Sequence, residues 1–234
     1  MRWLGLAAVG VLLLASCGGG RPAVAPPAKT LVHRHRTAPA PPVTLAARTT
    51  GILPAPLQDA AAAPWPGGGV FVGGLTAADT SSDQILVATR AGARIVGRLP
   101  GAFHDSAAAH LGGAVYAFGG GNGVAQLDQI LRIDPHTGRT AIVGRLPAPS
   151  SDQSAASIGR TAYVVGGYTG TRWLDTIVAW RPGSTAHVVA RLPYVVRYAA
   201  VATADGKLVI AGGSLENGTA SSPCTSSCRI VTCD

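Results

Sequence analysis

The chain of 234 residues is poor in aromatic and acidic side chains. Aromatic residues make up 5% of it, and 11 acidic residues stand against 19 basic ones, which gives a formal net charge of +8. Proteins that bind nucleic acid usually gather their cations in a patch, often with aromatic rings between them. Here the basic residues, of which only Lys29 and Lys207 are lysines, are spread along the chain. Nucleic acid is therefore a poor candidate for a partner.

Long apolar runs are also missing, except at the N-terminus. Residues 3–15 are apolar and follow the basic Arg2. The run is shorter than the roughly 20 residues of a spanning helix and is typical of a secretory signal. It ends in the letters LASC at 14–17, which resemble the bacterial lipobox. The resemblance implies that residues 1–16 are removed and that Cys17 is acylated; the alternative is an ordinary signal with an incidental cysteine.

An acylated Cys17 predicts a protein anchored by lipid at the extracytoplasmic face of the cell membrane. Residues 17–42 contain many prolines and several basic residues but no acidic one. Such a segment is extended and cannot bury a core, so we expect a tether. Its charge could be attracted by anionic lipid.

Two landmarks recur four times each along the rest of the chain, with one period. The Leu-Pro pairs begin at Leu53, Leu99, Leu146 and Leu192. They are separated by steps of 46, 47 and 46 residues, and apolar runs that end in two glycines recur with the same steps. The glycine pairs are Gly73-Gly74, Gly119-Gly120, Gly166-Gly167 and Gly212-Gly213. Landmarks that share a period of this size indicate a repeat architecture.

Each repeat reads as short strands separated by turns. Segments such as AVYAFGG and TAYVVGG are rich in β-branched and aromatic residues, and turn sequences such as Gly112-Gly113 and Asp205-Gly206 stand between the runs. No stretch within the repeats has a helical period. We therefore expect four antiparallel strands per repeat, arranged radially. The alanines at 107–109 suit the crowded innermost strand, and the glycine pair suits a sharp turn or a close approach.

The repeats resemble kelch repeats, which also form the central domain of galactose oxidase. The features that carry the resemblance are the glycine pair, a following Asp-x-Ile, a DPxTG-like turn and a GRLP exit. The resemblance implies an all-β fold, a kelch-type β-propeller made of four-stranded blades. Galactose oxidase activity would need a copper site with a Cys–Tyr cross-link, but no cysteine lies in the repeats. We therefore expect neither a metal nor another cofactor.

The propeller segment, residues 43–218, predicts an incomplete ring of about three and a half blades. A lone outer strand is expected before the first repeat, at 43–54. After the last glycine pair the pattern vanishes, and residues 219–234 form an irregular tail with Cys224, Cys228 and Cys233. These cysteines could suggest a metal site or a disulfide, but a truncated or shifted reading frame explains the tail more simply.

Repeat arithmetic also gives the candidate ligand-binding residues. An aspartate follows each Leu by six residues at Asp59, Asp105 and Asp152, and Tyr198 takes its place in the fourth repeat. We expect these positions near the mouth of a central channel, on the face that carries the loops 75–82, 121–127 and 168–174. The third loop adds Tyr168, Arg172 and Trp173. The alternative is structural: such an aspartate often satisfies nearby backbone N–H groups, and Trp173 could merely cover a sheet edge.

Two classes of function remain open. The first is a membrane-anchored, non-catalytic scaffold that binds a carbohydrate or a protein. The second is an extracytoplasmic enzyme that acts on a carbohydrate or a related metabolite. No order of Ser, His and Asp, metal-ligand cluster or phosphate-binding loop stands out in the sequence, and His104 next to Asp105 occurs in one repeat only. The scaffold is therefore the favoured interpretation.

Overall fold

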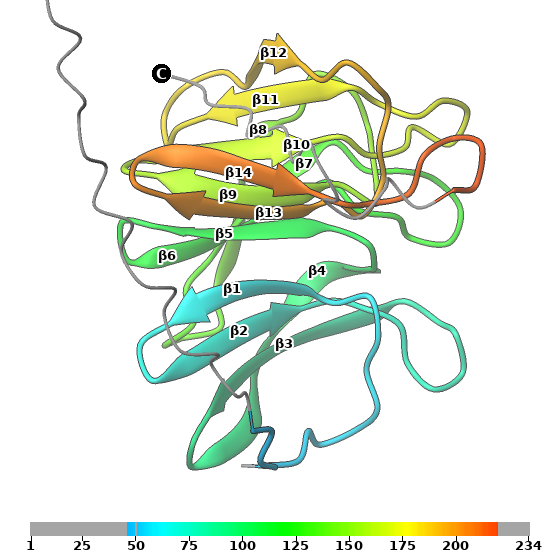
Figure 1. Cartoon of the computed structure of the whole chain (residues 1–234). Coiled ribbons are helices and arrows are strands. Elements are labelled where there is room, and N and C mark those ends of the chain that lie inside the picture. Colours follow the sequence, from blue (N-terminus) through cyan, green and yellow to red (C-terminus); the bar gives the residue numbers. More distant parts are fainter. Residues whose placement is uncertain (1–45, 50, 220–234) are drawn as a thin grey trace, which may run out of the picture. The chain divides into compact units, whose positions relative to one another are not determined.

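The computed structural model of the chain describes residues 46–49 and 51–219, which form fourteen β-strands and no helix (Figure 1). The predicted all-β class is therefore confirmed. The predicted signal peptide, the tether with Cys17 and the tail cysteines Cys224, Cys228 and Cys233 lie outside the described residues. Within the described part, no helix is long and apolar enough to cross a membrane.

The strands form antiparallel sheets in which neighbours follow one another in chain order. The first sheet contains β1 (Ala61–Trp65), β2 (Gly68–Val72), β3 (Ser82–Thr89) and β4 (Gly92–Phe103). The second contains β5 (Ala107–Leu111), β6 (Ala114–Phe118), β7 (Gln129–Ile133) and β8 (Thr140–Arg145). The third contains β9 (Ser154–Ile158), β10 (Thr161–Val165), β11 (Thr176–Trp180) and β12 (His187–Arg191). A two-stranded sheet contains β13 (Ala200–Ala204) and β14 (Lys207–Ala211).

Local turn chemistry explains why the strands pair in this order. The β5–β6 turn places Gly112 and Gly113 at φ of 56° and 84°, and the β13–β14 turn places Asp205 and Gly206 at 50° and 73°. Two-residue hairpin turns favour such positive φ values because they match the twist of the strands. The predicted four-stranded antiparallel units are thereby confirmed for three repeats, and the fourth repeat has two described strands.

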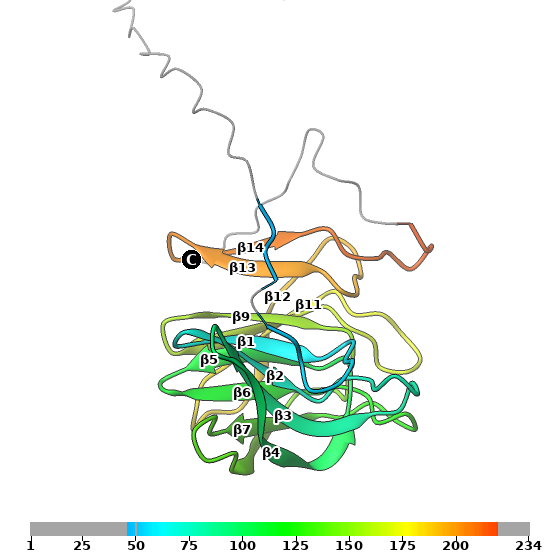
Figure 2. The ribbon, with the colours of Figure 1, turned by 90° about the horizontal axis from the view of Figure 1, so that it is seen from below.

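Neighbouring sheets meet through their first strands (Figures 1 and 2). Strand β1 contacts β5, β5 contacts β9, and β9 contacts β13. These strands carry alanines, of which Ala61, Ala63 and those at 107–109 are buried. A methyl side chain lets two backbones approach closely, so the alanine patches account for the contact between sheets.

Three apolar cores lie between the four sheets. The first contains Val70 and Ile85 of the first sheet with Val115 of the second. The second contains Phe118 of the second sheet and Trp180 of the third, whose rings meet edge to face at 5.8 Å. The third core joins the third sheet to the two-stranded one. Because alternate residues of a strand face opposite sides, the second and third sheets are each buried on both faces.

The Asp-x-Ile and Arg-Leu-Pro landmarks meet within each four-stranded sheet. The aspartate near the start of the third strand forms an ion pair with the arginine near the end of the fourth. The pairs are Asp83–Arg98 at 2.5 Å, Asp128–Arg145 at 2.6 Å and Asp175–Arg191 at 2.5 Å. The arginines are largely exposed, so each pair contributes about 0–1 kcal/mol and mainly records the repeated geometry.

Each glycine pair follows directly after the second strand of its sheet. The second glycine has φ between 100° and 116° in all four repeats. A Cβ there would lie 2.7–2.8 Å from the carbonyl oxygen of Gln58, His104, Ser151 or Arg197, one in each repeat. Only glycine combines this backbone conformation with such a close approach. The glycine pair therefore presses the start of each loop against the segment that enters the same repeat.

The N-terminal outer strand expected at 43–54 does not form in the described part of that segment. Residues 46–49 and 51–53 have no regular structure, and Ile52 is 85% exposed. A strand needs a partner whose N–H and C=O groups it can pair with. Residues 46–49 and 51–53 pair with none of the described strands, so this prediction is wrong for these residues.

Candidate functional site

The repeated aspartates and Tyr198 share an unusual backbone conformation. Asp59, Asp105, Asp152 and Tyr198 have φ values of 52°, 51°, 61° and 55°. The left-handed region is tolerated by aspartate, whose short polar side chain can bond locally, but it is sterically costly for a bulky residue. Each residue lies two positions before the first strand of its sheet. The conformation therefore turns the incoming chain onto that strand.

Main-chain hydrogen bonds link these four residues from sheet to sheet. The N–H of Asp105 donates to the carbonyl of Asp59 at 3.0 Å, that of Asp152 to Asp105 at 2.8 Å, and that of Tyr198 to Asp152 at 2.9 Å. We call this series the left-handed ladder. It brings the predicted positions side by side. Among the described residues, none of the three carboxylates accepts a hydrogen bond from a main-chain N–H, so the local bonding that the structural alternative assumes is not observed.

The carboxyl groups of the ladder influence one another. Burial, together with the charges of Asp152 and Asp59, raises the pKa of Asp105 to about 7. The cause is that a second negative charge is costly where water is partly excluded. The side chain of Asp152 is 2% exposed, and its Oδ2 lies 2.5 Å from Nη2 of Arg197. The ladder thus contains one paired carboxylate and one carboxyl group that keeps its proton up to near-neutral pH.

Arg197 is the central residue that sequence reasoning missed. Its guanidinium carbon lies 4.7 Å from the centre of the Tyr168 ring, 4.9 Å from that of Trp173 and 5.2 Å from that of Tyr198. Cations bind aromatic faces at such distances. Three predicted residues, Tyr168, Trp173 and Tyr198, therefore come together around an arginine that also pairs with Asp152. We call these five side chains the Arg197 cluster.

The loops and the incoming segments lie at one end of the sheets, as shown by the loops on the right of Figure 1. In every repeat, the residue before the ladder position forms a β-bridge with the residue after the glycine pair. The bridges are Gln58–Leu75, His104–Gly121, Ser151–Tyr168 and Arg197–Ser214. The expected shared face of loops and ladder is therefore present in the described residues.

Arg172 does not join the Arg197 cluster. It is exposed and lines a separate crevice of about 150 Å³ with Leu146, Val164 and Arg191. Trp173, by contrast, is partly buried and contacts Arg197, so it does more than cover a sheet edge. The third loop therefore contributes Tyr168 and Trp173 to the cluster but not Arg172.

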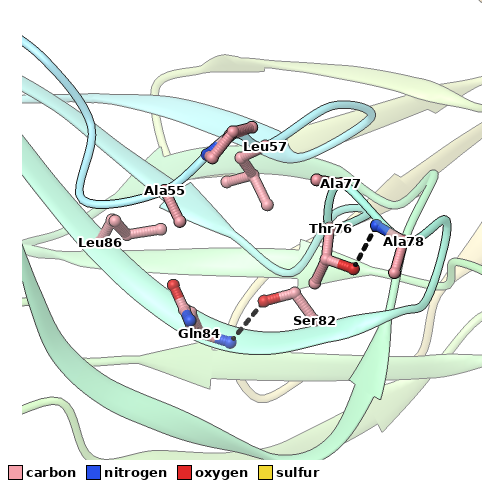
Figure 3. A pocket seen from close by; sticks show the side chains of 9 residues that line it. Ala55, Leu57, Thr76, Ala77, Ala78, Ser82, Gln84 and Leu86 are labelled. Carbon is pink, nitrogen blue, oxygen red and sulfur yellow. Dashed lines mark hydrogen bonds between the residues drawn. The ribbon is translucent and has the colours of Figure 1, made fainter.

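A second concave region lies beside the first loop (Figure 3). This cavity of about 280 Å³ is lined by Ala55, Leu57 and Leu86 and by the loop residues 76–78. Thr76 Oγ1 accepts a hydrogen bond from the Ala78 N–H at 3.3 Å, so the loop satisfies its own polar groups there. None of the ladder residues lines this cavity, and the charged chemistry lies elsewhere.

Two further findings concern possible metal ligands and the similarity of the chain to known proteins. Within the described residues, no three His, Cys, Asp or Glu side chains are placed to hold a metal ion together. A comparison of the chain with models of protein families finds no match, and a comparison with curated proteins finds none either.

Proposed function

We propose that residues 53–213 form consecutive blades of a kelch-type β-propeller. The support is the common period, the chain order of the four-stranded sheets and the contact of each first strand with the next one. In a propeller the blades surround a central axis, where small side chains and repeated bonds between equivalent residues are expected. The left-handed ladder supplies such bonds. Three four-stranded sheets and a two-stranded one would be about three and a half blades of an incomplete ring.

The proposal places this protein outside the cytoplasm, on the membrane. The support lies in the sequence: an apolar run of signal-peptide length and the lipobox-like letters before Cys17. Several acyl chains on Cys17 would give stable anchoring, since each buried CH₂ contributes about 0.8 kcal/mol. Residues 17–42 would then hold the propeller away from the lipid surface.

The proposed function is the binding of a carbohydrate at the loop-bearing face. The observation that carries it is the Arg197 cluster, where aromatic rings and charged groups meet beside the ladder. Arg197 Nε is buried and has no hydrogen-bond partner among the described residues. Sugars offer hydroxyl groups to carboxylates and guanidinium groups and C–H faces to aromatic rings. A protein segment that presents an acidic side chain is the other ligand such a cluster could accept.

Binding of the full chain to a glycan array tests the proposal. We expect binding to at least one glycan class, and we expect Arg197→Gln and Tyr168→Ala to weaken it about 10-fold or more, because each change removes a partly buried contact. Arg191→Gln is the matched control, since it removes one arginine whose partner, Asp175, lies away from the ladder.

Two outcomes would contradict the carbohydrate assignment. One is the absence of binding to any glycan. The other is equal affinity of the wild-type protein and the Arg197→Gln variant. Binding to an acidic peptide library with loss on Arg197→Gln would keep the site but change its ligand class to protein.

A further inference from the structure

The side chains of a serine, a histidine and an aspartate lie next to one another in space where the first sheet adjoins the second. We call such a junction between neighbouring sheets a seam. Ser81 Oγ lies 2.9 Å from Nδ1 of His104, and His104 Nε2 lies 3.8 Å from Oδ2 of Asp105. With the proton on Nε2 directed at the carboxylate, Nδ1 can accept the hydrogen of the serine hydroxyl. Hydrogen bonds of catalytic groups are often long before a substrate binds. This is the order of nucleophile, base and orienting carboxylate that acyl transfer requires.

The same pair of positions occurs at the seam of the Arg197 cluster with different residues. Ser81 bridges Leu75 as Trp173 bridges Tyr168, and His104 precedes Asp105 as Arg197 precedes Tyr198. The contact between Ser81 and His104 therefore corresponds to the contact between Trp173 and Arg197. The fold presents these two positions to each other, and at the first seam they hold a hydroxyl and an imidazole.

No side chain at position 121 covers the edge of the imidazole next to it. Gly121 exchanges two main-chain hydrogen bonds with His104, both at 2.8 Å. A Cβ on Gly121 would lie 3.5 Å from His104 Nε2, and the repeat-equivalent residue is the bulky Tyr168. The side chains of His104 and Asp105 are 20% and 17% exposed. The imidazole is thus sheltered but reachable on the side where glycine replaces a ring.

Main-chain N–H groups without a partner in the described part of the protein lie in the loop segment that carries Ser81. The N–H groups of Thr80 and Ser81 make no hydrogen bond with other residues of the described ranges. The N–H of the nucleophile's own residue commonly forms part of an oxyanion hole. The Ser81 N–H, which has no partner among the described residues, is therefore free to serve as one such donor.

We propose that Ser81, His104 and Asp105 hydrolyse esters of short acyl groups. The Ser81 Oγ forms a bond to the acyl carbon while His104 Nδ1 takes its proton. The bond between that carbon and the alcohol oxygen then breaks, and the alcohol leaves with the proton from His104. Water adds to the acyl-serine with His104 again as the base, which releases the carboxylic acid and restores Ser81. Asp105 is a positioning residue that holds the imidazole and stabilises its charged form.

Because atoms lie within 3.5–3.9 Å of where a Cβ on Gly121 would be, we infer that only a short acyl group such as acetyl fits there. The proposal goes beyond carbohydrate binding and does not rest on it, since the two sites use different residues. An ester carried on a sugar would engage both of them. A failure of glycan binding would leave ester hydrolysis standing, and the reverse also holds.

The test uses the full chain with p-nitrophenyl acetate and, separately, with diisopropyl fluorophosphate. We expect turnover by the wild-type protein, and a fall in kcat/KM of about 100-fold or more in Ser81→Ala and in His104→Asn, the scale of a lost acid–base group. The controls Ser184→Ala, in the β11–β12 turn, and His187→Asn, at the start of β12, are at exposed positions and should keep wild-type turnover. The fluorophosphate should label Ser81, as peptide mass mapping would show.

Asp105 has a readout of its own, because a carboxylate that supports the imidazolium acts only when ionised. The pKa of Asp105 is about 7, set by burial, Asp152 and Asp59 and opposed by Arg197. The wild-type kcat/KM should therefore rise with pH through this region, and Asp105→Asn should flatten the rise. Absence of turnover, a label on a residue other than Ser81, or an equal loss in His187→Asn and His104→Asn would overturn the proposal. Labelling is read on the wild-type protein, so the test holds even if a variant fails to fold.

Discussion

Tyr198 occupies a backbone conformation that the first three repeats fill with aspartate. The steric cost of a bulky residue at a positive φ is of order 1–3 kcal/mol and persists only where the surroundings enforce it. Here the ring contacts Arg197, and burial together with the charges of Asp152 and Asp105 raises the pKa of Tyr198 to about 12. The phenol therefore stays protonated and can donate a hydrogen bond to a ligand.

The raised pKa of Asp105 predicts a pH-dependent cost to stability. A folded-state pKa of about 7, against 3.8 for the unfolded chain, means that the folded protein binds more protons between these values. The free energy of unfolding contributed by this group therefore falls as pH rises through that window. Asp105→Asn removes the ionisable group, and asparagine also tolerates the left-handed conformation. At pH 8 we expect the variant to gain about 1–2 kcal/mol relative to wild type, after allowance for solvent screening.

Urea unfolding of both proteins at pH 4 and pH 8 checks this expectation. The difference between variant and wild type should be small at pH 4, where Asp105 is protonated in the folded protein. His104, Asp59, Asp152 and Arg197 face the same carboxyl group and are unchanged in both proteins. A difference that is equal at the two pH values would show that Asp105 ionises normally.

Sequence reasoning found the ladder positions but not Arg197, for a physical reason. Every repeat has the same left-handed backbone turn at the ladder position. Because aspartate tolerates this conformation, it recurs there in three of the four repeats. Arg197 stands at a position that holds Gln58, His104 and Ser151 in the other repeats. His104 and Arg197 contact the loop of the preceding repeat, a contact that only the three-dimensional arrangement reveals. The available signal in the sequence was that the residue before the ladder position differs in every repeat, whereas the ladder position itself is aspartate in three of them.

At the scale of elements, the glycine pairs decide where each second strand ends. Gly120 has φ of 108°, and a Cβ there would lie 2.8 Å from the His104 carbonyl oxygen. Gly120→Ala should therefore lower the free energy of unfolding by about 2–3 kcal/mol, because backbone strain and a steric clash act together. Thermal unfolding followed by circular dichroism measures the effect.

The matched control for this prediction is Gly112→Ala. Gly112 has a positive φ of 56°, but a Cβ there would meet no atom within 4 Å. Its substitution should cost only the conformational strain, about 1–2 kcal/mol. Equal losses in the two variants would mean that the close approach at Gly120 contributes nothing.

The strands were predictable because local signals agree with the tertiary arrangement. Turn residues such as Gly112-Gly113 stand between apolar runs, and the hydrophobic pattern leaves no helical alternative. The described part of the outer strand expected at 43–54 has no partner strand among the described residues. Pairing is a property of two segments, so the pattern of one segment could not decide it.

For the whole chain, the clearest prediction concerns Cys17. If acylation at this cysteine anchors the protein, Cys17→Ser should abolish the lipid-dependent increase in mass and either release the protein or leave an unprocessed precursor. Membrane fractionation of bacterial cells that express the full chain, followed by intact mass measurement, checks the outcome. A serine variant with wild-type mass and membrane partition would rule out the lipid anchor.

The left-handed ladder ties neighbouring sheets together at their loop-bearing end. It joins each sheet to the next by one main-chain bond at the loop-bearing end, whereas described contacts near the opposite end include Trp65 packed on His110 and on His136. Side-chain packing is deformed more readily than a main-chain hydrogen bond. We therefore expect thermal displacements between neighbouring sheets to be larger at the far end than at the ladder. A ligand at the ladder would lie where the displacement between neighbouring sheets is smallest. Its binding site would already be ordered before binding, so the entropic cost of ordering protein groups would reduce the affinity little.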